Sequence, residues 1–244
     1  METLTNKIVL VVGGGSGIGL GIGLAFAREG SRVVLAARTA ATLAAAKNLP
    51  EIGAALLTKI CDATDRAQVA DLVAWTAANA GPIDILVYSA GVNVPRRTFA
   101  DIDPADFDRV TATNATGAFN CMHAVLPAMR ARKTGLIINV VSLAGLRVLQ
   151  LAGLPYATSK FAQSAIGTFA NLEALPDGVR VTNLYPGETE TPILAQRAVP
   201  PTAEQRARML QPEDVAALAV AVAKLPPRAT VPEIVITPRH MPFV

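Results

Sequence analysis

The sequence lacks any uninterrupted apolar run of the roughly 18 residues that a membrane-spanning helix needs. This holds even though 51% of its 244 residues are hydrophobic. Its first residues, Met-Glu-Thr-Leu-Thr-Asn-Lys, contain no apolar segment of the signal-peptide type. We therefore expect a cytoplasmic protein with no membrane partner.

The sequence also lacks a strong excess of charge and is poor in cysteine. The formal net charge is +3 with scattered Lys and Arg, so no nucleic-acid partner is expected. Cys61 and Cys121 lie far apart and form no Cys-x-x-Cys pair, which predicts buried free thiols. His123 has no partner at metal-ligand spacing, so its predicted role is structural and no metal is expected.

Strand and helix patterns alternate along the whole chain. This alternation is typical of a parallel sheet with helices on both faces, a three-layer α/β/α architecture of about seven strands. The predicted strands cover residues 8–12, 32–37, 54–60, 83–88, 136–141, 179–184 and 233–236. The predicted helices cover residues 20–29, 39–48, the segment from the cap Asp65 to Asn79, 104–132, 156–174 and 213–225. Pro127 should kink or split the fourth helix. No repeat or linker is evident, so one domain over 1–244 is predicted.

A glycine turn joins the first predicted strand to the first predicted helix. Backbone N–H groups at such a helix start have no helical partner, and the helix dipole favours an anion there. Gly13, Gly17 and Gly19 have the spacing Gly-x-x-x-Gly-x-Gly, which differs from the Gly-x-Gly-x-x-Gly of the usual dinucleotide fingerprint. The turn indicates a pyrophosphate site, and the alternative is an ordinary strand-to-helix turn.

Polar residues and glycines follow the other predicted strands as well. In a parallel sheet, ligands bind beyond the carboxyl ends of the strands. The residues at these ends are Gly13, Arg38, Asp62, Gly91, Ser142 and the pair Pro186-Gly187. Their gathering at one edge is a second indication of a binding site.

Tyr156 and Lys160 are four residues apart on a predicted helix and so share one face. A tyrosine with a pKa of about 10 is a poor base at neutral pH. A nearby ammonium group stabilises the phenolate and lowers that pKa, so the phenol can exchange a proton with an alcohol or carbonyl. The alternative is an amphipathic helix with a surface Lys and a half-buried Tyr.

Taken together, these motifs resemble the short-chain dehydrogenase/reductase family. The matching positions are Gly13-x-x-x-Gly17-Ile18-Gly19, Asp62, Ala90-Gly91, Asn114, Ser142, Tyr156-x-x-x-Lys160 and Pro186-Gly187. The resemblance implies a Rossmann-like doubly wound sheet, a nicotinamide cofactor, and hydride transfer between the cofactor and a ketone or secondary alcohol. It also implies a homodimer or homotetramer. The alternative is a non-catalytic dinucleotide-binding sensor or regulatory subunit on the same fold.

The resemblance also assigns roles to residues. Tyr156 is implied as general acid/base, and Lys160 lowers its pKa and holds the nicotinamide ribose. Ser142 positions the reacting oxygen, and Asn114 binds a water that extends a proton path to Lys160. The implied cofactor-binding residues are Gly13, Gly15, Ser16, Gly17, Ile18, Gly19, Arg38, Thr39, Asp62, Ala63, Ala90, Gly91, Tyr156, Lys160, Pro186, Gly187, Thr189 and Thr191.

The chain departs from the family pattern in four places. Val12 replaces the usual Thr, and Tyr88-Ser89 replaces the usual Asn-Asn. Thr189 replaces the Val of the usual Pro-Gly-x-Val-x-Thr, and the chain does not close with Asp-Gly-Gly after its last strand. The Arg96-Arg97 pair is either solvated or a contact for an acidic substrate or cofactor phosphate.

The cofactor and the substrate pocket can also be predicted. Ala37 stands where NAD-preferring relatives place Asp, and Arg38 and Thr39 follow, which predicts NADP(H) in preference to NAD(H). The pocket walls are predicted from Leu143, Ala144, Leu149, Leu154 and a lid over 188–211. Because these walls are mostly apolar, a hydrophobic or mid-sized substrate is expected.

Overall fold

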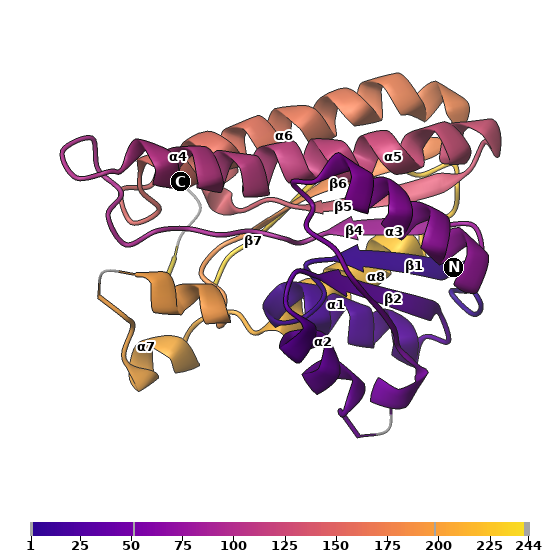
Figure 1. The fold of residues 1–244 in the computed structure, drawn as a ribbon, viewed down its shortest axis with the longest axis horizontal. Helices are drawn as coiled ribbons and strands as arrows, with labels where there is room; N and C mark the ends of the chain where they lie inside the picture. Colours follow the sequence, from indigo (N-terminus) through magenta and orange to yellow (C-terminus); the bar gives the residue numbers. More distant parts are fainter. Residues whose placement is uncertain (1, 51, 198, 242–244) are drawn as a thin grey trace.

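The fold is a parallel sheet between two layers of helices, seen in a computed structural model that describes residues 2–50, 52–197 and 199–241 (Figure 1). The seven strands lie in the order β3-β2-β1-β4-β5-β6-β7, and every pairing is parallel. Their bounds are β1 Ile8–Val12, β2 Arg32–Ala37, β3 Leu57–Ile60, β4 Ile85–Tyr88, β5 Gly135–Val140, β6 Val179–Pro186 and β7 Glu233–Ile236. This is the predicted Rossmann-like arrangement.

The helices divide between the two faces of the sheet. They are α1 Gly17–Arg28, α2 Ala40–Lys47, α3 Arg66–Asn79, α4 Pro104–Thr111, α5 Gly117–Ala131, α6 Leu154–Ala174, α7 Ala203–Ala207 and α8 Pro212–Ala223. Side chains of β1 alternate between two cores: Leu10 packs with residues of α3, α5 and α6, and Val11 packs with residues of α1, α2 and α8. Continuous apolar strands are therefore buried on both faces. No helix among the described residues is long and apolar enough to cross a membrane.

The helix predicted over residues 104–132 is found over 104–131, but it is not split at Pro127. Pro127 lies inside α5, and the helical segment is interrupted earlier, by a π-helical turn over Ala112–Thr116. Two buried side chains, one from outside the turn and one within it, connect this turn to the strand and loop of β4. The Tyr88 hydroxyl donates to the carbonyl of Thr113, and the Asn114 amide bonds to both backbone groups of Val92. A π-turn changes the helical bonding locally and is frequent at functional sites. Thus the tyrosine that replaces the usual asparagine after β4 braces the helical layer.

Smaller corrections concern the ends of elements. The third strand begins at Leu57 rather than 54, because a 3₁₀ turn, Gly53–Ala55, precedes it. The helix predicted from 156 begins at Leu154 and has Pro155 in its first turn, where a missing N–H costs nothing. The segment 188–211 contains a 3₁₀ helix, Pro192–Gln196, and the short helix α7; its Ala198 lies outside the described residues.

Substitution of a glycine in the turn after β1 can test how closely the backbone packs at this edge of the sheet. Gly13 and Gly30 both have φ of +83°, a left-handed conformation that costs a non-glycine residue roughly 1–2 kcal/mol. A Cβ on Gly13 would lie 2.4 Å from the backbone nitrogen of Ala90, whereas a Cβ on Gly30 would meet its nearest atom, in Thr5, at 3.3 Å. Gly13→Ala should therefore destabilise the protein by about 1–3 kcal/mol more than Gly30→Ala. Urea unfolding of both variants measures this difference, and equal losses would contradict it.

Candidate active site

A cavity of about 440 Å³ lies at the carboxyl ends of the strands. It has the size of a small-molecule or cofactor site. The predicted site residues that line it are Gly13, Gly15, Ser16, Gly17, Ile18, Arg38, Thr39, Asp62, Ala63, Ala90, Gly91, Ser142, Tyr156, Lys160, Pro186, Gly187, Thr189 and Thr191. Gly19 and Asn114 lie behind the wall instead. A Cβ on Gly19 would be 2.2 Å from the carbonyl oxygen of Gly13, so Gly19 supports the turn.

The glycine turn and the start of α1 fit a dinucleotide pyrophosphate. Ser16 is the N-cap of α1, and its side chain makes no capping hydrogen bond. Gly17 has φ of +54°. Gly13 lies so close to the backbone after β4 that a Cβ at this position would clash with it. The amides of this helix start therefore meet the cavity without side chains in the way, as an anion requires.

The residues at the carboxyl end of β2 line the same half of the cavity as the glycine turn. Ala37 closes the strand, and the exposed Arg38 follows it. Among the described residues Arg38 forms no ion pair. The Asp62 carboxylate accepts two hydrogen bonds within its own loop, from the backbone N–H and from the hydroxyl of Thr64.

Ser142 and Tyr156 meet on the opposite side of the cavity. Ser142 follows β5 as the cap of a 3₁₀ turn, Leu143–Gly145, and its hydroxyl accepts from the N–H of Ala144 at 3.1 Å. Tyr156 lies in the first turn of α6, and the Ser142 hydroxyl lies near its phenol, where it favours the phenolate. The Lys160 ammonium lies 5.6 Å from the centre of the tyrosine ring.

Burial governs the protonation of this group. It raises the pKa of Tyr156 to about 12, although the nearby Ser142 hydroxyl opposes the rise. It lowers the pKa of Lys160 to about 7. The expected lowering of the tyrosine pKa by Lys160 is therefore not found in this structure, because Lys160 is buried, Tyr156 is partly buried, and the charged form of each is disfavoured.

Gln163 is a contact of this site that the sequence reasoning missed. The Lys160 ammonium donates to Gln163 Oε1 at 2.6 Å and to the Val140 carbonyl at 3.3 Å. Gln163 Nε2 donates in turn to Asn139 Oδ1 at 2.7 Å, and Asn139 bonds to Asn183. The available signal was a polar side chain one turn beyond Lys160, on the face that packs against the sheet. These neutral amides hold the ammonium in place but bring no negative charge.

Asn114 belongs to the frame of the site. It is fully buried, and its amide donates to Ser159 Oγ at 2.9 Å as well as to the Val92 carbonyl. It thereby links the π-turn to the loop after β4 and to α6, which carries Tyr156.

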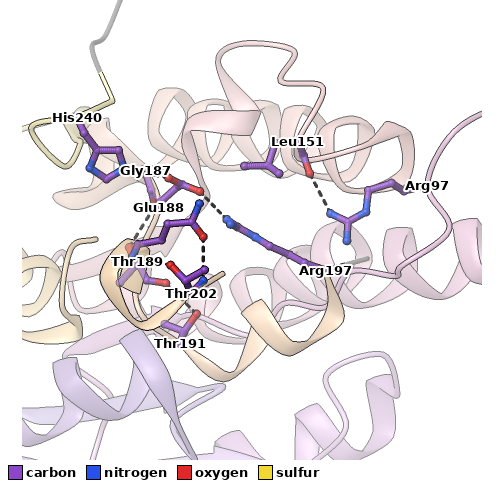
Figure 2. A network of polar contacts seen from close by, with 10 residues as sticks. Arg97, Leu151, Gly187, Glu188, Thr189, Thr191, Arg197, Thr202 and His240 are labelled. Atoms are coloured by element: carbon purple, nitrogen blue, oxygen red, sulfur yellow. Dashed lines mark hydrogen bonds and ion pairs between the residues drawn. The ribbon is translucent and has the colours of Figure 1, made fainter. Parts of the chain in front are cut away.

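The remaining walls come from the segments after β4, β5 and β6. Leu143, Ala144 and Leu149 line the cavity as predicted, whereas Leu154, the first residue of α6, does not. Of the predicted lid, the lining residues lie within 188–197. Figure 2 shows the charged part of this wall, in which Arg197 donates to Glu188 at 2.8 Å and His240 contacts the other carboxylate oxygen at 3.2 Å.

The remaining cysteine, histidine and arginine predictions can be compared with the structure. Cys61 and Cys121 are buried free thiols, as predicted. The ring of His123 packs near Phe119 at 5.4 Å between centroids. The described residues contain no group of three or more His, Cys, Asp or Glu that could hold a metal. Arg97 lines the cavity while Arg96 is exposed, so the two arginines are not equivalent.

Comparison with known proteins identifies the family. The family model for short chain dehydrogenases matches residues 7–200. Glycine betaine reductase ATRR of Emericella nidulans is 35% identical over 98% of this chain, which spans about a fifth (19%) of that relative's length. L-fucose dehydrogenase of Bos taurus is 33% identical over 95% of this chain and 88% of its own.

Two solved structures carry a nicotinamide cofactor on the same fold. The closed form of a serine dehydrogenase complexed with NADP+ has a TM-score of 0.89 and 28% identity, over 97% of both chains. A 3-ketoacyl-(acyl-carrier-protein) reductase from Brucella melitensis complexed with NADH has a TM-score of 0.84 and 28% identity, over 96% of this chain and 98% of its own. The chain belongs to the short-chain dehydrogenase/reductase family and is an enzyme of that family, an oxidoreductase of CH-OH and C=O groups.

Proposed function

We propose that residues 1–244 form one NADP(H)-dependent oxidoreductase domain that interconverts a ketone and a secondary alcohol. The observation that carries this proposal is the convergence of Ser142, Tyr156 and Lys160 in the cavity that also holds the glycine turn. A dinucleotide sensor needs the turn, but it has no need of a partly buried tyrosine beside a serine and a buried lysine. The similarity to dehydrogenases and reductases favours the enzyme over the sensor.

The chemistry divides between cofactor and protein. The bound nicotinamide supplies or accepts the hydride. The Tyr156 hydroxyl donates a proton to the carbonyl oxygen in reduction and accepts it back from the alcohol in oxidation. The Ser142 hydroxyl donates a hydrogen bond to the same oxygen, where charge develops. The apolar residues Leu143 and Leu149 exclude water from this point, which strengthens both interactions.

Lys160 is placed to act between cofactor and tyrosine. Its ammonium is held by Gln163 within reach of the cavity, and it binds the ribose hydroxyls when the cofactor is present. A lysine with a pKa of about 7 exchanges protons readily at neutral pH. It can therefore return a proton to Tyr156 after each turnover, with Asn114 holding a water on that path.

Arg38 supports the choice of NADP(H). No acidic side chain stands at the end of β2, and the Arg38 guanidinium lines the cavity without an ion-pair partner among the residues described. A guanidinium forms a charge-assisted, often bidentate contact with a phosphate. Thr39 adds a hydroxyl beside it.

A homo-oligomer is the proposed assembly. Large apolar side chains are exposed on α5 and α6, among them Phe119, Phe161, Phe169 and Leu172. The two helices pack against each other on one face of the molecule (Figure 1). An exposed apolar face of this kind marks an association surface.

Tyr156→Phe deletes the proton donor and little else. We expect kcat to fall by about 10²–10⁴-fold while the Kd for NADPH stays nearly unchanged. Reduction of a ketone panel followed by NADPH absorbance gives the first quantity, and fluorescence titration gives the second. A variant that keeps more than about a tenth of the wild-type rate would contradict the role of Tyr156. Tight NADPH binding by the wild type with no turnover of any ketone would favour the sensor.

Lys160→Met tests the buried ammonium through stability. Because burial lowers the pKa of Lys160 from 10.5 to about 7, the unfolded chain holds more protons than the folded one between these pH values. Stability of the cofactor-free wild type should therefore rise relative to the variant as pH increases from about 7 to 10, at up to ~1.4 kcal/mol per pH unit. Urea unfolding across this range measures the difference. Parallel pH curves for the two proteins would show that Lys160 titrates normally.

Arg38→Ala tests the cofactor. Loss of one charged contact to the phosphate should weaken NADPH binding by roughly 10- to 150-fold and leave NADH binding unchanged. Arg38→Lys keeps the charge and is the matched control, which should retain part of the preference. The assignment fails if the wild type binds NADH as tightly as NADPH, or if Arg38→Ala weakens both equally.

A further inference from the structure

The substrate end of the cavity carries more positive charge than the contacts around it balance. Three charged side chains line this end, Arg97, Arg197 and Glu188. Glu188 forms an ion pair with Arg197 through one carboxylate oxygen, and its other carboxylate oxygen contacts His240 (Figure 2). Arg97 forms no ion pair with any residue that the structure describes. One guanidinium charge is therefore left over in a wall whose other lining residues are apolar, such as Leu149 and Leu151, or polar and uncharged, such as Asn93.

Arg97 is held by neutral groups alone. It donates from Nη1 to the carbonyl of Leu151 at 2.9 Å, from Nη2 to the carbonyl of Gln196 at 2.8 Å and from Nε to that of Pro95 at 3.4 Å. A guanidinium has five N–H groups, so one on each terminal nitrogen has no acceptor within the described residues. The Arg97 side chain is thus fixed in place, and two of its N–H groups remain available for hydrogen bonds to a ligand.

The surroundings of Arg97 also favour the binding of an anion. Burial lowers the pKa of Arg97, and the neighbouring Arg197 lowers it further, which shows that the two guanidinium groups repel each other. An anion between or beside them would relieve this repulsion. Two terminal N–H groups of one guanidinium match the two oxygens of a carboxylate.

The position of Arg97 relates it to the reacting groups. Its carbonyl accepts from the N–H of Leu154, and its side-chain carbons occupy the space beside Gly153, the cap of α6. Tyr156 lies in the first turn of this same helix. Arg97 is therefore tied to the element that carries the proton donor. Arg38, in contrast, lies at the end of β2, in the half of the cavity formed by the glycine turn.

We infer that the substrate carries a carboxylate, as an oxo acid or the corresponding hydroxy acid, and that Arg97 with Arg197 binds this carboxylate while its carbonyl meets Tyr156 and Ser142. The inference rests on the function proposed above and names its substrate class. The apolar residues Leu143, Leu149 and Leu151 then contact the carbon chain between the two ends. The reaction stays balanced, since hydride goes to the carbonyl carbon and the Tyr156 proton to its oxygen.

The test compares each acid with its own uncharged ester. Reduction by NADPH is measured for 2-, 3- and 4-oxo acids and their methyl esters, in the wild type, Arg97→Met, Arg97→Lys and Arg96→Met. The wild type should favour at least one acid over its ester by about tenfold or more in kcat/KM. Arg97→Met should bring that ratio close to one, and Arg97→Lys should keep part of it. Arg96→Met is the matched control, because Arg96 is exposed next to Arg97, and it should leave the ratio unchanged.

Other outcomes would overturn the inference. If Arg97→Met lowers kcat/KM for acid and ester alike, Arg97 has a structural role only. If the wild type reduces esters and neutral ketones but no acid, the substrate class is wrong and the proposed oxidoreductase function stands. If no carbonyl compound of either kind oxidises NADPH, both the substrate class and the proposed function are wrong.

Discussion

The burial of one parallel sheet on both faces is the constraint on which the rest of this structure depends. Val11 pairs with Leu35 of β2 and with Val87 of β4, and it has no exposed surface. Such strands carry polar side chains along their length only where these are hydrogen-bonded, as Asn139 of β5 and Asn183 of β6 are. Most polar side chains therefore fall on the residues that follow the strands. Because all strands are parallel, these residues meet at one edge. The glycine turn and Ser142 face the same cavity for this reason.

The same burial determines the pKa values of Lys160 and Tyr156, the groups proposed to react. Lys160 is surrounded by the amide of Gln163 and the carbonyl of Val140, which satisfy its hydrogen bonds without supplying a negative charge. Desolvation is then unopposed by any carboxylate, and the ammonium loses its proton easily. Desolvation favours the neutral form of Tyr156 as well, and for a phenol this raises the pKa. A neutral phenol beside an easily deprotonated lysine is a suitable resting arrangement for donating a proton.

The substrate end depends on contacts between three loops rather than on the sheet. Arg97, in the loop after β4, reaches carbonyls in the loop after β5 and in the segment after β6. Asn93 reinforces this closure, with its N–H donating to Gln196 and its amide to the carbonyl of Ala152. Loops of this kind vary without disturbing the sheet, which lets one fold serve different substrates.

The sequence by itself determined the layers of this protein and most of its site. Apolar runs such as 8–12 and 32–37 become strands of those bounds, because a strand buried on both faces needs an uninterrupted apolar stretch. The glycine turn and Ser142 could also be identified from the sequence, because each follows an apolar strand. The Tyr156–Lys160 pair could be identified from its helical spacing. Tertiary structure alone decided what these residues touch. The π-turn at 112–116 depends on Tyr88 from a distant strand, and the partner of Lys160 depends on the packing of α6 against β5. The difference between Arg96 and Arg97 likewise arises from loops that meet only in the folded chain, so no local pattern could have contained it.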